Sequence, residues 1–571
     1  MNKYYIKVLI AVTIIFNVVG LCFPVLRNDD PMLYANIAKN MLLNGDWINL
    51  MQPLGSDWLD KPHLPFWITA LSFKILGINS FAYDFPAFIF NLIGTYYTFL
   101  LGKYLYNKQV GFLASLIYLS SFHLILSSTV DVRAEAYLMG MITPACYYWL
   151  LFFKDISINF RYLLKGALFT ACGVMTKGIF VFITISSGIL SVIMYKLIIN
   201  KQFNDDKGWG LINSKLILKV FLAICLSIIL IIPEILALYV QFDLHPEKVI
   251  YHNTNVSGVK WFLWDSQLGR FFNTGPITRY SSGIGHYFYF IHTYLWAFLP
   301  WSMVFVFATY KIVNQWKNIE QSEKYNYVFL LGSFCITFIL FSLTSFQLDY
   351  YTNIIMPFAA IICASWIYKI RVDYPSVRHP VFYFQIYLAV LLCVLPIIGG
   401  YYVLDGNSRL IVVSTGGGVL ILFGLFSHLE VLNKAVLYPV LAINYVFLFL
   451  MLIYGLVYAN YDFGYKIAQY LNEDKKVNYV VDFELHSLTL QFYTTKNYIF
   501  KSDVSRLAEF SKPFYLVSNL AHGEAVQRIL GNKCVIQKYF TGTTIDRVIS
   551  GIFNKKTLED SQKNYIVLLC N

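Results

Sequence analysis

The chain has 571 residues, of which 57% are hydrophobic and only 13% are charged, and its formal net charge is +12. A soluble domain carries about 25% charged residues, so this composition excludes an ordinary soluble protein. The positive charge does not indicate a nucleic-acid partner, because basic residues in short loops mark the cytoplasmic side of membrane proteins. The sequence therefore predicts a polytopic α-helical membrane protein.

About thirteen apolar runs come near the roughly 20 residues that a membrane-spanning helix needs. The first run has no small-residue cleavage site after it, and we expect it to be a retained membrane helix rather than a signal peptide. The run 161–175 is the shortest. The runs are 5–26, 82–103, 109–128, 136–153, 161–175, 178–196, 216–240, 286–310, 326–345, 351–369, 381–403, 409–427 and 436–458.

An odd number of spans places the two termini on opposite sides of the membrane. With a cytoplasmic N-terminus, the short inner connections are dense in Lys and Arg, as the positive-inside rule requires. The outer side then receives two long segments, the first loop (27–80) and the second loop (241–285), together with the polar tail. Within the first loop, 31–43 and 64–76 are predicted to be helices that lie along the membrane surface, because 64–76 is too short to span.

The polar tail is predicted to be a small α/β domain, 461–571, that follows a membrane domain, 1–460. Short β-branched or aromatic runs alternate there with helix-like segments. Cys534 and Cys570 could pair in an oxidising compartment, although their spacing alone does not show a disulfide. The predicted helices are 463–472 and 521–530, and the predicted strands are 478–482, 488–493, 514–518, 534–539 and 565–570.

The residues best suited to catalysis and binding lie in the two outer loops. A hydroxyl acceptor needs a carboxylate to take its proton, and a departing lipid phosphate needs cations. The first loop contains Asp29, Asp30, Asp46, Asp57, Asp60 and Lys61, and the second contains Arg270, Arg279 and His286. Carboxylates and cations on one side of the membrane indicate a transferase with a lipid-phosphate leaving group.

Residues 30–67 resemble the first loop of the GT-C glycosyltransferases, and within them the group of the lipid A aminoarabinose transferases and protein O-mannosyltransferases. The matching residues are Asp30, Tyr34, Ala35, Gly45, Asp46, Trp47, Lys61, Pro62 and Trp67. Two later segments resemble the same family, through Gly269-Arg270-Phe271, His286, Phe288-Tyr289-Phe290 and Leu299-Pro300-Trp301, and then through Phe341-Ser342, Leu348, Tyr351 and Pro357. The resemblance covers most of residues 20–360, and the outer α/β tail also resembles the aminoarabinose branch.

The resemblance implies a GT-C fold and a glycosyltransferase of the bacterial inner membrane, with its tail in the periplasm. It implies a polyprenyl-phosphate-linked sugar as donor, a lipid, protein or glycan acceptor, and inversion in a single displacement. Asp30 would be the general base, and Asp29, Asp131 and Glu135 are the other acidic candidates. Lys61, Arg270 and Lys177 would contact the donor phosphate, and the substrate cavity would be lined by Tyr34, Trp67, His286 and Tyr351.

Several of these residues also have a structural interpretation. Asp30 could cap the helix that starts at Pro31. Asp131 and Glu135 could form a local ion pair with Arg133, which lies between them. An interfacial anchor is the alternative for Lys61, Arg270, Lys177 and His286, and His123 is expected to be structural.

Three departures from the family pattern argue against aminoarabinose as the sugar. They are Pro31 in place of a glutamate, Leu33 in place of an arginine and Gln347 in place of a lysine. A lipid or small-molecule transporter, or flippase, would show repeats or paired broken helices, and an assembly protein would explain the tail but not the first loop. The sequence has no CxxC or HExxH motif, so it predicts no dedicated metal site and leaves metal use open.

Overall fold

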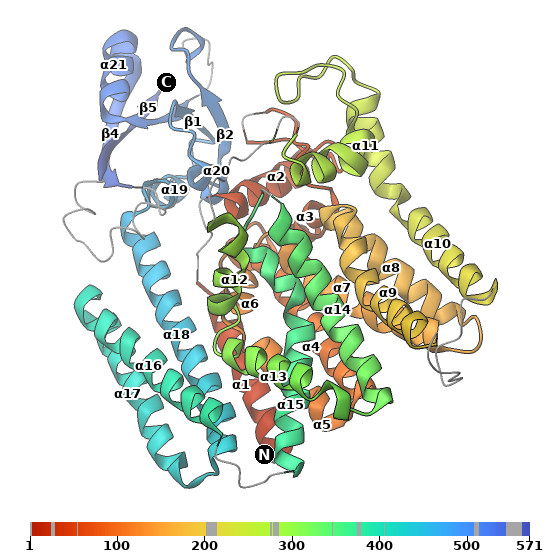
Figure 1. Ribbon diagram of the computed structural model, residues 1–571. Coiled ribbons are helices and arrows are strands. Elements are labelled where there is room, and N and C mark those ends of the chain that lie inside the picture. Colours follow the sequence, from red (N-terminus) through yellow and green to blue (C-terminus); the bar gives the residue numbers. More distant parts are fainter. Residues whose placement is uncertain are drawn as a thin grey trace.

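A computed structural model describes residues 3–23, 29–53, 55–200, 214–274, 277, 285–344, 346–373, 379–404, 406–507, 513–543 and 562–571. Long helices form a bundle, and a smaller domain with a β-sheet sits on one end of it (Figure 1). The N-terminus lies at the far end of the bundle, whereas the C-terminus lies in the smaller domain. That the termini face opposite sides of the membrane stays a prediction.

Ten helices of the described residues are long and apolar enough to cross a membrane, and a bent pair would make eleven. The chain is therefore a multi-pass membrane protein, although the predicted number of thirteen spans is not confirmed. The ten spans contain α1 (Lys3–Leu21), α4 (Ser80–Leu105), α7 (Ala134–Lys154), α9 (Phe180–Asn200), α10 (Ser214–Leu238), α14 (Gln321–Leu343), α15 (Met356–Asp373), α16 (Pro380–Val403), α17 (Gly406–Leu425) and α18 (Val431–Tyr461).

The centre of the bundle is formed by α7 and by the span that joins η4 (Asp349–Ile355) to α15. In both, 83% of the apolar window is buried, against 17% in α10 and in α17. Apolar helices that bury so little of their surface within the protein are solvated by lipid. The interior helices are therefore the ones able to position polar side chains, and α7 carries Glu135 in its first turn.

The two surface helices expected in the first loop are present as α2 (Asp30–Asn44) and α3 (Leu64–Leu76). Helix α2 lies across the end of the bundle that carries the smaller domain (Figure 1). Proline in its first turn and Gly45 in the left-handed conformation after its end define its limits, as expected for helix termini. The structure thus places α2 between the membrane helices and the smaller domain.

Two runs predicted as continuous helices are broken. The run 109–128 forms α5 (Lys108–Leu119) and α6 (Phe122–Ser127). The hydroxyls of Ser120 and Ser121 donate to carbonyls of the preceding turn at 2.6 and 2.8 Å, which competes with continuation of the helix. The run 286–310 forms α12 (Gly285–Ala297) and α13 (Ser302–Asn314), bent by 116°, with Pro300 at the break.

The remaining helices of the bundle are short or carry several charges. Helix α8 contains Arg161, Lys165 and Lys177 within 18 residues, which explains why it is not among the ten apolar spans. These helices are α8 (Phe160–Lys177), the π-helices η1 (Tyr239–Asp243) and η2 (Trp261–Gly269), α11 (Gly258–Lys260), and the 3-10 helices η3 (Trp316–Asn318) and η5 (Phe426–His428).

The tail domain (461–571) contains a five-stranded sheet in the order β2-β1-β3-β5-β4. Strand β1 is parallel to β2 and β3, whereas β5 is antiparallel to β3 and β4. A disulfide joins Cys534 to Cys570 across β4 and β5. The elements are α19 (Phe463–Glu473), β1 (Tyr479–Phe483), α20 (Leu488–Tyr493), β2 (Asn497–Lys501), η6 (Ser505–Leu507), β3 (Phe514–Asn519), α21 (Leu520–Leu530), η7 (Gly531–Lys533), β4 (Cys534–Gly542) and β5 (Lys563–Cys570).

The α/β character of the tail domain is confirmed, but one predicted strand is wrong. Residues 488–493 form helix α20, and the strand lies further on, at β2. Ser487 caps the helix, because its hydroxyl accepts a hydrogen bond from the Leu490 amide at 3.1 Å. A serine before a short apolar run is a helix-start signal, and here it overrides the β-propensity of the aromatic residues.

Reporter fusions can test the orientation. We expect alkaline phosphatase fused after Asn571 to be active, since the basic inner loops predict that the tail domain lies outside. The control is the same reporter fused after Lys108, in a predicted inner connection, where it should be inactive. The opposite pattern of activities would reverse the topology.

Candidate active site

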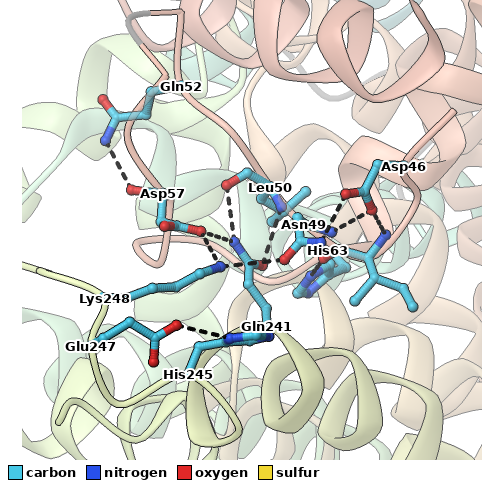
Figure 2. A network of polar contacts seen from close by, with 11 residues as sticks. Asp46, Asn49, Leu50, Gln52, Asp57, His63, Gln241, His245, Glu247 and Lys248 are labelled. Carbon is cyan, nitrogen blue, oxygen red and sulfur yellow. Dashed lines mark hydrogen bonds and ion pairs between the residues drawn. The ribbon is translucent and has the colours of Figure 1, made fainter. Parts of the chain in front are cut away.

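The first loop is joined to the second by a network of polar contacts (Figure 2). The side-chain amide of Gln241, in η1, both donates to and accepts from the backbone of Leu50, at 3.0 and 3.1 Å. The same amide donates to Asp57 at 3.0 Å, and Lys248 donates to Asp57 at 2.8 Å. The carboxylate of Asp46 accepts the Ile48 and Asn49 amides of its own turn. Asp57 is thereby engaged in joining the two loops, and Asp46 in holding its own turn of the first loop.

A buried ion pair fixes the segment that follows Lys61. The Nδ1 atom of His63 lies 2.9 Å from Glu234 of α10, and the His63 amide donates to the same carboxylate at 3.1 Å. Both side chains are fully buried. Burial alone would lower the pKa of His63, but the Glu234 carboxylate outweighs it and raises that pKa. The contact of His63 with Glu234 thus ties the first loop to a membrane helix, two residues after Lys61.

Three cations and one carboxylate line the same cavity. Its polar wall comes from both loops and from the end of α8, whereas its apolar wall comes from α9, α14 and η4. The charged lining residues are Asp60, Lys61, Lys177 and Arg270, and the others are Phe180, Val181, Thr184, Ser266, Gln267, Phe271, Leu340, Phe341, Thr344, Phe346, Tyr351 and Ile354. We call this space the cation cavity.

Asp60 brings two of these cations together. Its carboxylate lies 2.8 Å from the Lys61 ammonium and forms an ion pair with Arg270. Burial works against the charged form of Lys61, yet the field of its neighbours, first that of Tyr351, outweighs burial and raises its pKa. The Nε atom of Arg270 is buried and has no hydrogen-bond partner among the described residues. The guanidinium therefore keeps a donor for a ligand.

Lys177 reaches the cation cavity from the last residue of α8. Its ammonium forms an ion pair with Glu135 and lies 3.5 Å from the centroid of the Tyr351 ring. Gly178 follows with φ of +95°, and a Cβ atom there would collide with the Gln267 side chain of the second loop. Glycine therefore lets the second loop pack directly over the turn that carries Lys177.

A second group of charges surrounds Arg133. The guanidinium donates to Asp29 at 2.7 Å, to Asp30 at 2.6 Å and to Asp131 at 2.7 Å. We call these four residues the acidic cluster. Three carboxylates around one guanidinium leave excess negative charge, and Asp30 remains 35% exposed. Within the described part of the chain only Oδ2 of Asp30 is engaged, so Oδ1 can meet a hydroxyl group.

Tyr350 separates the acidic cluster from the cation cavity. The centroid of its ring lies 4.7 Å from the Arg133 guanidinium carbon and 5.7 Å from the Lys177 ammonium. Tyr351, the next residue, lines the cavity. The Tyr350 ring is therefore in contact with the cation of the acidic cluster and with one of the three cations of the cavity.

The structure distinguishes between the alternative interpretations of the acidic residues. Helix α2 begins at Asp30 itself and has no side-chain capping hydrogen bond, so the capping interpretation of Asp30 is wrong. Asp131 does pair with Arg133, but Glu135 pairs with Lys177 instead. The predicted local ion pair therefore holds for only one of the two residues.

Two residues predicted for the substrate cavity are not in the lining of the cation cavity. Tyr34 is buried against Trp58 and Phe66, where burial and then the charge of Asp30 raise its pKa. Trp67 donates to the backbone carbonyl of Trp47 at 2.6 Å. Both side chains support the first loop. The His286 side chain and Arg279 lie outside the described residues.

Arg133 and Tyr350 are the site residues that the sequence did not assign. The signal for Arg133 was its position between two acidic residues at the outer end of a span, which suggested only a local ion pair. His123 hydrogen-bonds Asn353 at 2.8 Å in the buried interior, as expected for a structural histidine. No group of three or more His, Cys, Asp or Glu side chains in the described residues could hold a metal ion.

Comparison with known proteins finds a matching family model and similar relatives. Residues 60–235 match the family model described as dolichyl-phosphate-mannose-protein mannosyltransferase. The chain is 28% identical over 346 residues to undecaprenyl phosphate-alpha-4-amino-4-deoxy-L-arabinose arabinosyl transferase 2 of Proteus mirabilis, covering 59% of this chain and 55% of that one. The corresponding transferase of Edwardsiella ictaluri is 23% identical, covering 62% and 58%. The chain spans little more than half the length of these curated relatives.

The fold has a counterpart among solved structures. The crystal structure of ArnT from Cupriavidus metallidurans bound to undecaprenyl phosphate superposes with a TM-score of 0.69, over 99% of this chain and 98% of that one, at 13% identity. The chain therefore has a GT-C-type membrane fold with a small C-terminal sheet domain. Its resemblance to the aminoarabinose transferase and protein mannosyltransferase group is confirmed by the family model and by these relatives.

Proposed function

We propose that the protein is a glycosyltransferase that moves a sugar from a polyprenyl-phosphate donor to a lipid A, protein or glycan acceptor on the outer face of a bacterial inner membrane. The observation that carries this proposal is the cation cavity, in which Lys61, Lys177 and Arg270 converge beside apolar side chains. A lipid-linked phosphate needs both surfaces, cations for its head group and apolar side chains for its chain.

Lys61 and Arg270 would hold the donor phosphate. Charge-assisted hydrogen bonds to a phosphate are the strong ones, and an arginine can form two of them in parallel. The Phe180 and Val181 side chains of α9 and the Leu340 side chain of α14 continue the cavity as an apolar wall. The start of the polyprenyl chain would lie against that wall, which explains why the enzyme is embedded in the membrane.

Asp30 would act as the general base. Its Oδ1 takes the proton of the acceptor hydroxyl as that oxygen attacks the anomeric carbon from the face opposite the phosphate. The bond between the anomeric carbon and the phosphate oxygen breaks, and its electron pair stays on the leaving phosphate. Arg133 orients Asp30 through Oδ2, while Lys61 and Arg270 neutralise the new charge. The product has the inverted configuration.

The identity of the sugar is a separate question from the reaction. The name of the Proteus mirabilis relative specifies an amino-deoxy-arabinose, yet Pro31, Leu33 and Gln347 depart from the family pattern. Gln347 is buried and donates to the Ser342 carbonyl at 3.3 Å, so it places no charge where the family has a lysine. We therefore propose a different glycosyl group from the one named for those relatives.

A mass comparison tests the proposal. Lipid A and surface glycoproteins from a strain without the gene should lose a mass equal to one sugar residue, and the wild-type gene should restore it. A gene carrying Asp30→Asn is the matched control and should not restore it, although the protein should accumulate normally. Unchanged masses, together with protein-dependent movement of lipid across vesicle membranes, would favour a transporter instead.

A further inference from the structure

The tail domain contacts the helix that begins with Asp30 through an unusual buried lysine. Lys39 of α2 is 7% exposed, and its ammonium donates to three backbone carbonyls of the tail domain. The acceptors are Gln491 at 2.7 Å, Phe492 at 3.0 Å and Thr494 at 2.9 Å. These carbonyls belong to the end of α20, where helical carbonyls lack intrahelical partners and attract cations.

A second contact supports the same attachment. The Asn36 amide, one turn earlier in α2, donates to the Leu488 carbonyl at the start of α20 at 2.9 Å. The rings of Phe492 and Phe73 lie 6.0 Å apart, so α3 contacts α20 as well. Polar side chains of α2 therefore form hydrogen bonds with both ends of α20.

Within the tail domain, α20 is held firmly by the sheet and by α19. The Asp482 carboxylate, on β1, accepts the Leu485 and Ser487 amides at 2.8 and 2.9 Å. Asn472, at the end of α19, donates to the Tyr493 carbonyl at 2.9 Å. Helix α20 is thus fixed to the sheet, and the contact of Lys39 with α20 couples α2 to the sheet.

We infer that Lys39 is a positioning residue. Its contact fixes α2 to the tail domain, an attachment that we call the clamp, and thereby holds Asp30 against Arg133. Lys39 lies nine positions after Asp30, or about 13.5 Å along the helix axis. Because a helix of this length is rigid, fixing Lys39 near one end also fixes the position of the Asp30 carboxylate at the other. The link to catalysis rests on the proposed function, whereas the mechanical link between tail domain and α2 does not.

The test uses the purified full-length protein in lipid nanodiscs. Lys39→Met keeps most of the length of the side chain but removes its donors, so kcat for sugar transfer should fall about tenfold to a hundredfold, as expected for a displaced catalytic group. The dissociation constant for undecaprenyl phosphate should stay within about twofold of the wild-type value. Hydrogen exchange of the amides in 30–44 should become faster. Lys39→Arg, which keeps the donors, should restore part of the rate.

Lys496→Met is the matched control. Its ammonium also donates to two backbone carbonyls, those of Asp474 at 2.5 Å and Val477 at 2.6 Å, but all three residues lie inside the tail domain. It should destabilise that domain without changing kcat or the exchange of 30–44. If Lys39→Met does not accumulate, Asn36→Ala removes the contact with Leu488 and should give the same changes in a weaker form.

The results of these experiments test the clamp and the proposed function separately. Wild-type kcat together with unchanged exchange in Lys39→Met would overturn the clamp, and so would a loss confined to phosphate binding. If the wild-type protein transfers no sugar at all, the proposed function fails. In that case faster exchange of 30–44 in Lys39→Met would still support the clamp, and unchanged exchange would overturn it.

Discussion

Replacement of Asp30 by Asn should lower the rate of sugar transfer by about 10²–10⁴-fold, the usual contribution of a general base. Asparagine has the same size as aspartate, and its side-chain oxygen can still accept the hydrogen bond that Arg133 donates at 2.6 Å. Only the negative charge and the basicity are removed. Since the helix start uses no side-chain cap, the fold of α2 should not change. Single-turnover rates with a bound donor would measure the effect.

Asp29→Asn is the natural control for that experiment. Asp29 binds the same guanidinium at 2.7 Å and is about as exposed as Asp30, so both variants remove one charge from the acidic cluster. If Asp30 is the base, the Asp29 variant should keep most of its activity. Similar losses in both would mean that the charge of the cluster matters rather than one proton acceptor, and the larger loss in Asp29 would identify that residue as the base.

Much of the fold could be predicted because the signals are local. Apolar runs and Asp30-Pro31 predicted most of the long helices and α2, and alternating runs predicted the α/β tail domain. Where the prediction was wrong, local hydroxyl groups and contacts with distant segments together decide the conformation. The break after α5 depends on hydroxyls that bond to the preceding turn and on the Phe122 amide, which donates to the distant Leu299 carbonyl at 2.9 Å. Helix α20 is completed by Lys39, which is more than 400 residues away in sequence.

The candidate site shows the same limit. The sequence could indicate that the two outer loops share one side, and the structure brings Lys61, Lys177 and Arg270 to one cavity. It could not indicate that Arg133 binds carboxylates from two segments, because Asp30 is 103 residues away from it. Nor could it indicate that Glu135 belongs to the cation cavity through Lys177, while its neighbour Asp131 belongs to the acidic cluster. Pairing among several charges is decided by packing.

Replacement of Arg270 by Gln should raise the dissociation constant for undecaprenyl phosphate about tenfold to a hundredfold. A hydrogen bond to a charged group contributes roughly 1.5–3 kcal/mol, and about 1.4 kcal/mol corresponds to a factor of ten. The loss should be at the upper end, because Asp60 would then lie in the cavity with Lys61 as its only remaining cationic partner among those that line it. The same change should slow sugar transfer, since the leaving phosphate carries more charge than the bound donor.

Lys248→Gln provides the control for this loss of charge. Lys248 also joins the first loop to the second, through Asp57 at 2.8 Å, but it does not line the cation cavity. Both variants therefore remove one positive charge and one contact between the loops, and only Arg270→Gln removes a group proposed to touch phosphate. Phosphate binding that weakens equally in both would show that loop attachment, rather than direct contact, is responsible.

A weaker effect of Lys248→Gln that disappears at high salt would reveal a long-range contribution, because exposed charges are screened beyond about 10 Å at 0.1 M salt. The Arg270 effect should persist there, since its side chain is only 14% exposed and lies against Asp60 and the Phe346 ring.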